Sequence, residues 1–145
     1  MSKGNTWEND LLLLVFNNTN AANIGDATGL RGSTTVGSLF LSLHTADPGE
    51  AGDQTTSEAT YTGYARVAVA RTTGGFTVSA NAVTLVANTD FGACTAGTNT
   101  ITHFAIGTAS TGTGKVLYKG ALSPSISVTS GVTPRILSGT IVTED

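Results

Sequence analysis

The sequence predicts a mainly β protein: an antiparallel β-sandwich or jelly roll with a short N-terminal helix. Thr, Ser and Gly make up 56 of the 145 residues, and Thr, the commonest of them, favours strands. Short apolar segments recur from residue 38 onward with Gly-containing turns between them. No helices are interleaved with these segments, which favours antiparallel pairing in a sandwich or jelly roll.

The composition predicts one folded domain over residues 1–145. A chain of this length can bury a core without disulfides or metals. Hydrophobic residues make up 39% of the sequence and charged residues only 12%, and this composition excludes intrinsic disorder. The seven Lys and Arg residues are scattered and the net charge is −3, so we expect no nucleic-acid partner. We divide the domain into an arm, helix and loop extension (1–37) and a β-sandwich (38–145).

Residues 1–5 are predicted to form a polar arm, and Thr6–Phe16 is predicted to be a helix capped by Asn5 with Glu8 as its reciprocal partner. Most apolar side chains of this helix fall on one main stripe along its surface, which is listed below, and further apolar side chains lie off it. The helix is therefore apolar nearly all round. It is therefore either buried in its own domain, which we favour, or docked into a partner chain. We nevertheless expect residues 1–16 to serve contacts with other subunits more than the sandwich itself. The main stripe consists of Trp7, Leu11, Leu14 and Val15.

Residues 21–37 carry four Gly and no sustained periodicity, which indicates a long irregular loop of the functional or flexible kind. The first strand, Leu39–Leu43, places Leu39, Leu41 and Leu43 on one face, and an acidic loop follows it. Further strands are predicted at 64–71, 76–78, 82–86, 90–91, 100–106 and 116–118, and around Ile126 and Val128, Ile136, and Ile141 and Val142.

Motifs for chemistry are absent or incomplete. Residues 109–116 (ASTGTGKV) resemble a phosphate-binding loop but carry Ala109 in place of the first Gly and Val116 in place of Ser or Thr, so we interpret residues 107–114 as a flexible hairpin loop. Cys94, His44 and His103 lack the close spacing of zinc ligands, and Cys94 has no adjacent cation to activate it. We therefore predict no enzymatic activity, no metal and no cofactor. The enzymatic alternative is a small hydrolase that uses Cys94, His44 or His103.

The acidic loop after the first strand contains His44, Asp47, Glu50 and Asp53, which do not have the spacing of a calcium loop. We interpret the loop as a solvated acidic surface. The single cysteine excludes an intrachain disulfide and suits folding in a reducing cytoplasm. The longest apolar run, Leu11–Phe16, is too short to span a membrane, and we expect neither export nor a membrane partner.

Several segments resemble a family of small tailed-bacteriophage virion proteins. These are LFLSLHTADPGEAG (39–52), YTGYARV (61–67), ITHFAIGTA (101–109), VLYKGAL (116–122) and TIVTED (140–145). The N-terminal helix also fits this pattern, so the resemblance covers nearly the whole chain. Members are often described as tail-fibre-like, and similar small β proteins act as capsid decoration or cement proteins. The resemblance implies a non-enzymatic part of a virus particle and brings no metal or active-site residue.

We expect a capsid decoration protein that binds the outside of the head shell and stabilises it, as a homodimer or homotrimer with the major capsid protein as its partner. A neutral surface rich in hydroxyl groups suits protein contacts, and an acidic chain belongs away from packaged DNA. The alternative is a tail-fibre or tail-appendage receptor-binding protein, for which Tyr61 and Tyr64 are the aromatic residues near a loop that could stack on sugars. The predicted interface comprises Trp7, Leu11, Leu14, Arg31, Asp47, Glu50 and Asp53.

Overall fold

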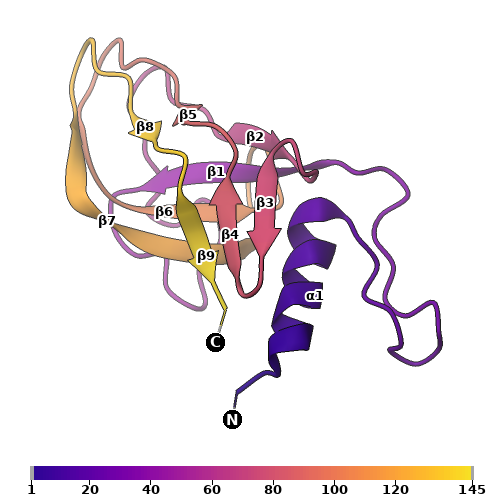
Figure 1. Ribbon diagram of the computed structural model, residues 1–145. Helices are drawn as coiled ribbons and strands as arrows, with labels where there is room; N and C mark the ends of the chain where they lie inside the picture. Colours follow the sequence, from indigo (N-terminus) through magenta and orange to yellow (C-terminus); the bar gives the residue numbers. More distant parts are fainter. Residues whose placement is uncertain (1, 145) are drawn as a thin grey trace. The chain divides into compact units, whose positions relative to one another are not determined.

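The computed structural model describes residues 2–144 and confirms a mainly β fold with antiparallel sheets and one short N-terminal helix. The elements are α1 (Asn5–Asn17), β1 (Ser38–His44), β2 (Val67–Ala70), β3 (Phe76–Ser79), β4 (Ala82–Leu85), β5 (Thr89–Asp90), β6 (Asn99–Gly107), β7 (Val116–Val128), β8 (Arg135–Ile136) and β9 (Thr140–Thr143). They form sheets of order β2-β1-β6-β7, β3-β4-β9 and β5-β8 (Figure 1). No helix among the described residues is long and apolar enough to cross a membrane.

The described chain separates into two compact units. Unit 1 contains residues 2–38, 69–88 and 137–144, and unit 2 contains residues 39–68 and 89–136. Neither unit is continuous in sequence, because the chain passes from one to the other four times. The expected division into an extension (1–37) and a β-sandwich (38–145) stays a prediction.

In unit 1, α1 packs against the hairpin formed by β3 and β4 (Figure 1). Leu12 and Phe16 are fully buried, and the ring of Phe16 meets that of Phe76 edge to face with centroids 5.0 Å apart. Such aromatic pairs add to the energy of burial itself. The side of α1 that enters the core is therefore the Leu12–Phe16 side, which lies off the stripe that contains Trp7.

Both ends of α1 are stabilised differently from the sequence prediction. The helix begins at Asn5, so the predicted Asn5 cap is wrong: Gly4 occupies the N-cap position and no side chain caps the first turn. At the other end, Asn18 adopts a left-handed conformation (φ 54°) that ends the helix. The guanidinium of Arg71 donates to the carbonyls of Val15 and Leu14, both at 2.7 Å, where a cation complements the helix dipole.

In unit 2, β1 and β6 form the centre of the four-stranded sheet. Leu39, Leu41 and Leu43, which the sequence places on one face of this strand, are buried. Ser42 and His44 on the other face are also fully buried. Both faces of the end of β1 are therefore shielded from water, and their polar groups require partners within the protein.

The two strands predicted around 116–118 and 126–128 are one long strand, β7, which pairs with β6 throughout. A bulge accounts for the interruption of its pattern. Ile101 pairs with Ile126 whereas His103 pairs with Ala121, so two steps along β6 correspond to five along β7. Such an insertion bends a strand and breaks its inward–outward alternation, which is the periodicity that sequence analysis follows.

Candidate functional site

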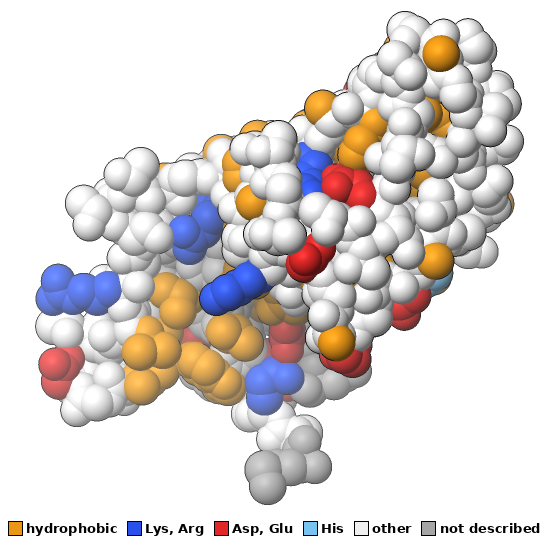
Figure 2. Space-filling view, turned by 180° about the vertical axis from the view of Figure 1, so that it is seen from behind, with side chains coloured by type: hydrophobic (Ala, Val, Ile, Leu, Met, Phe, Trp, Pro, Cys, Tyr) orange, Lys and Arg blue, Asp and Glu red, His pale blue; other side chains and the backbone are white. Residues whose placement is uncertain are grey.

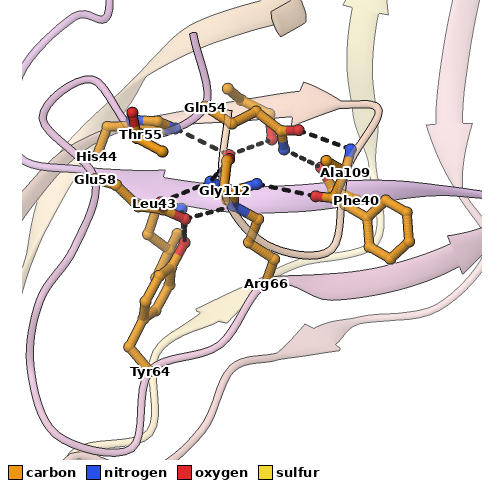
Figure 3. A network of polar contacts seen from close by, with 12 residues as sticks. Phe40, Leu43, His44, Gln54, Thr55, Glu58, Tyr64, Arg66, Ala109 and Gly112 are labelled. Atoms are coloured by element: carbon orange, nitrogen blue, oxygen red, sulfur yellow. Dashed lines mark hydrogen bonds and ion pairs between the residues drawn. The ribbon is translucent and has the colours of Figure 1, made fainter. Parts of the chain in front are cut away.

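The most elaborate polar site in unit 2 is built around Arg66, and we refer to Glu58, Tyr64 and Arg66 as the Arg66 clamp (Figure 3). Arg66 Nε donates to Glu58 Oε1 at 2.6 Å and Nη2 donates to Oε2 at 2.7 Å. Tyr64 donates its hydroxyl hydrogen to Glu58 Oε1 at 2.9 Å. The Arg66 side chain is only 3% exposed, so this bidentate pair is shielded from solvent.

The protonation states of the clamp follow from these contacts. The hydrogen bonds to the Glu58 carboxylate raise the pKa of Arg66, because they stabilise its charged form. Burial raises the pKa of the Tyr64 hydroxyl, because the phenolate would lose its hydration. Tyr64 therefore stays neutral, donates to Glu58 and accepts a hydrogen bond from the Leu43 amide at 3.0 Å.

The Arg66 clamp holds the loop of residues 107–114 in place. Arg66 Nη1 donates to the carbonyl of Ala109 at 3.0 Å, and Nη2 donates to the carbonyl of Gly112 at 2.8 Å (Figure 3). A pocket of about 230 Å³ lies between the clamp and residues 110–112. The predicted flexible hairpin is thus a loop anchored at two carbonyls, with Ser110 to Thr113 exposed at its tip.

A second anchor of the same loop is Gln54, which is fully buried. Its Oε1 accepts a hydrogen bond from the Ala109 amide at 2.9 Å, and its Nε2 donates to the carbonyl of Phe40 at 3.3 Å. The carboxamide lies so close to Gly107 and Gly114 that a Cβ on either would stand 2.1 Å from it. The two glycines at the base of the loop are therefore required by Gln54 rather than by turn conformation.

His44 and Ser42 form a buried hydrogen-bonded pair beneath this region. His44 Nδ1 lies 2.9 Å from the carbonyl of Thr56, so it carries the proton, and Nε2 accepts from the Ser42 hydroxyl at 2.9 Å. Burial lowers the pKa of His44 by disfavouring its charged form. Neither side chain is exposed, so the pair has the contacts of a serine–histidine dyad without access for a substrate.

The other residues considered for chemistry or binding are also packed. Cys94 is 1% exposed, and its thiol faces the carbonyls of Ala96 and Gly97. Tyr61 is 3% exposed and donates to the carbonyl of Gly92 at 2.9 Å, while Tyr64 belongs to the clamp. Neither tyrosine is therefore a free platform for stacking on sugars. The absence of enzymatic activity stays a prediction.

The predicted interface residues occupy separate places in the structure. On α1, Trp7, Leu11 and Leu14 are half-buried, and hydrophobic side chains gather over this helix on the face shown in Figure 2. Arg31 is exposed on the loop that follows α1. These residues belong to unit 1, and the acidic members of the set belong to unit 2.

Asp47 and Glu50 converge on one cation, Lys119 Nζ, at 3.0 and 3.2 Å. The pKa of Asp47 is lowered first by the amide of Gly49 and then by Lys119. Asp53 instead accepts from the hydroxyl and amide of Thr55, which lower its pKa. Among residues 2–144 no group of three or more acidic, His or Cys side chains is arranged to hold a metal ion.

Sequence analysis missed the residues that organise the site, Gln54, Glu58 and Arg66. One signal was available: Arg66 lies within the segment 61–67 that carries the family resemblance, at a position where a charged side chain interrupts apolar neighbours. Nothing local to Gln54 or Glu58 distinguishes them from other polar loop residues.

Residues 2–144 match the family model described as podophage GP4 fiber I protein gp80. No curated protein matches the sequence significantly. Because the match spans nearly every residue, the chain belongs to the podophage GP4 fiber I protein gp80 family, a family of phage virion structural proteins.

Proposed function

We propose that this chain is a structural subunit of a fibre on the phage particle. The observation that carries the proposal is the family match over residues 2–144, since the description of that family names a fiber protein. The fold is compatible with a structural role, because the polar side chains of the Arg66 clamp and Gln54 form their hydrogen bonds with one another and with the backbone. The site described above therefore serves to position a loop.

Two surfaces are suited to contacts with neighbouring subunits. The first is the side of α1 that carries Trp7, Leu11 and Leu14, where half-buried apolar side chains can become fully buried in a partner. The second is the exposed tip of the 107–114 loop, which the Arg66 clamp and Gln54 hold rigid before any partner arrives. Rigidity of this kind reduces the entropy lost on association.

A head decoration protein remains the second candidate. The observation that favours it is the length of α1: 13 residues are too few for the coiled-coil stalk of an extended fibre. In that role the same surfaces would contact the major capsid protein, and many copies bound to one shell would stabilise it by mass action.

Location and copy number in the virion distinguish the two candidates. Gold-labelled antibody against the chain should decorate fibres in electron micrographs of intact particles, and quantitative mass spectrometry should give far fewer copies than the major capsid protein. Labelling spread over the head, with a copy number close to that of the major capsid protein, would contradict the fibre proposal and support decoration.

A further inference from the structure

A pocket beside the Arg66 clamp combines fixed walls with hydrogen-bonding groups that solvent can reach. It has a volume of about 230 Å³ and lies between the clamp, Ala65 and residues 110–112, all of which belong to unit 2. Pockets that hold drug-sized ligands have volumes of about 300–1,000 Å³. This pocket therefore accommodates a smaller ligand, such as a single ring.

The walls of the pocket are held in place before any ligand binds. Arg66 donates to the carbonyl of Ala109 at 3.0 Å and to that of Gly112 at 2.8 Å, and these bonds fix the loop wall at two points (Figure 3). Gln54 also binds the Ala109 amide, at 2.9 Å. A preformed wall loses little conformational entropy on binding, so a few hydrogen bonds suffice for measurable affinity.

The charges that line the pocket cancel. The Glu58 carboxylate and the Arg66 guanidinium form a bidentate pair, and no other charged side chain among residues 2–144 lines the pocket. An ionic ligand would lose hydration on entry without meeting an unpaired opposite charge. The pocket therefore favours a ligand without net charge.

The pocket offers hydrogen-bonding groups of two kinds, a carboxylate oxygen and hydroxyls. Glu58 Oε1 accepts from Arg66 and Tyr64, whereas Oε2 accepts from Arg66 Nη2 at 2.7 Å. A carboxylate oxygen has two lone pairs, so Oε2 can accept a further hydrogen bond from a ligand. The Glu58 side chain is 17% exposed, which leaves it within reach. On the loop, Ser110 and Thr111 are exposed, and each hydroxyl can both donate and accept.

These groups match a ligand with several hydroxyls, because a hydroxyl donates to a carboxylate and exchanges hydrogen bonds with other hydroxyls in both directions. We propose that the pocket binds one neutral sugar ring, with one hydroxyl donating to Glu58 Oε2 and others bonded to Ser110 and Thr111. Tyr64 serves as a wall rather than a stacking platform, since its ring stacks on that of Phe91 with centroids 6.2 Å apart. The inference goes beyond the proposed fibre function and does not rest on it.

The test titrates the isotope-labelled full chain with sugars and follows its amide signals by two-dimensional NMR. The probes are the methyl glycosides of glucose, galactose, mannose and rhamnose, whose blocked anomeric oxygen mimics a unit within a glycan. At least one should shift the amides of residues 110–112 in a saturable manner. The free sugar, measured beside it, should bind more weakly if the ligand is a glycan unit and more tightly if it is a monosaccharide in solution. The uronate of the same sugar should bind more weakly than the neutral form, because its charge faces Glu58.

Variants on the exposed loop test the contacts without touching the clamp. Ser110→Ala and Thr111→Val each remove one hydroxyl, and each should weaken binding by about two- to tenfold, as the loss of one hydrogen bond does. Thr113→Val is the matched control: it makes the same change on the same loop, at a residue that does not line the pocket, and should bind like the wild type. Glu58→Gln keeps the shape of the side chain and should weaken binding by about tenfold or more.

Absence of saturable shifts with all four glycosides would overturn the inference, as would shifts confined to residues outside the pocket. Unchanged binding by both Ser110→Ala and Thr111→Val, or an equal loss in Thr113→Val, would do the same. The loop variants change exposed side chains, so they decide the question even if Glu58→Gln disturbs the fold. The same spectra report whether each variant remains folded.

Discussion

Gln54 shows how one buried side chain determines the identity of residues far from it in sequence. Its carboxamide bonds the Ala109 amide and occupies the space that side chains at Gly107 and Gly114 would need. Neither glycine has a positive φ, so conformational freedom does not explain them. The cause is close packing against a polar group that must itself stay hydrogen-bonded.

Gly107→Ala should therefore destabilise the protein, because the new Cβ would stand 2.1 Å from the Gln54 carboxamide. Overpacking of this kind costs about 1–3 kcal/mol in free energy of unfolding. Urea denaturation measures the loss. Gly139→Ala is the matched control, since nothing lies within 4 Å of the added Cβ there. Equal stability of the two variants would contradict this account.

His44 makes stability depend on pH. Its pKa in the folded protein is below 6.5 because burial disfavours the imidazolium. Between that lowered pKa and 6.5, the unfolded chain binds more protons than the folded chain, so the free energy of unfolding falls as the pH falls through this window. Thermal melts at graded pH should show the decline below about pH 6.5. A His44→Gln variant should lose this slope, and a wild-type melt that is flat in the window would contradict the assignment.

At the scale of elements, α1 has two apolar sides with different roles. One side buries Leu12 and Phe16 against β3, and another leaves Trp7, Leu11 and Leu14 half-buried. This helix is apolar nearly all round, and only some of its apolar side chains are therefore buried within unit 1. The two alternatives considered from the sequence, core and interface, apply to different sides of the same helix.

Leu12→Ala and Leu14→Ala separate these roles. Leu12→Ala should lower the free energy of unfolding by about 2–5 kcal/mol, because it leaves a cavity in a closed core. Leu14→Ala should cost much less in the isolated chain and should instead weaken incorporation into particles. Denaturant unfolding and a particle-binding assay measure the two effects. A Leu14→Ala variant as unstable as Leu12→Ala would place both residues in the core.

The strand β7 illustrates how an exposed edge is kept from aggregation. It forms one edge of the four-stranded sheet and is 13 residues long. The strand carries the charged Lys119, a bulge opposite Ile101–His103, and Pro124 within the bulge. Charges, bulges and prolines are the devices by which natural edge strands avoid pairing with other chains.

At the scale of the whole molecule, each of the two discontinuous units contains buried apolar residues of its own, such as Leu12 and Phe76 in unit 1 and Leu41 and Ile101 in unit 2. Unit 1 depends on α1, β3, β4 and β9, and unit 2 depends on β1, β6 and β7. Local destabilisation should therefore stay within a unit, since cooperative opening follows contiguous packing.

Hydrogen exchange read by mass spectrometry tests this independence. In the wild type, amides in the centres of β1 and β6 should exchange most slowly, and those at the tip of the 107–114 loop much faster. Leu12→Ala should speed exchange in residues 69–88 more than in residues 100–106. Equal acceleration in both segments would mean that the chain opens as a single unit.

Much of the architecture could be predicted from the sequence because its signals are local. Alternating apolar residues in 39–43 and 100–106 indicate strands β1 and β6 directly, and the run after Asn5 indicates a helix. The family followed from several segments spread over the chain, and the family match confirms a phage virion structural protein. These features depend on residues that are neighbours in sequence.

What only the tertiary structure decided are contacts between distant residues. Arg66 meets the carbonyl of Ala109, which is 43 positions away, and Arg71 binds the end of a helix 56 positions before it. The choice of the Leu12 side of α1 for the core was equally undetermined, since several sides are apolar and only packing against Phe76 selects one. The periodicity of a segment indicates which of its residues face the core and which face solvent. Its hydrogen-bond partners and packing neighbours depend instead on which distant segments pack against it.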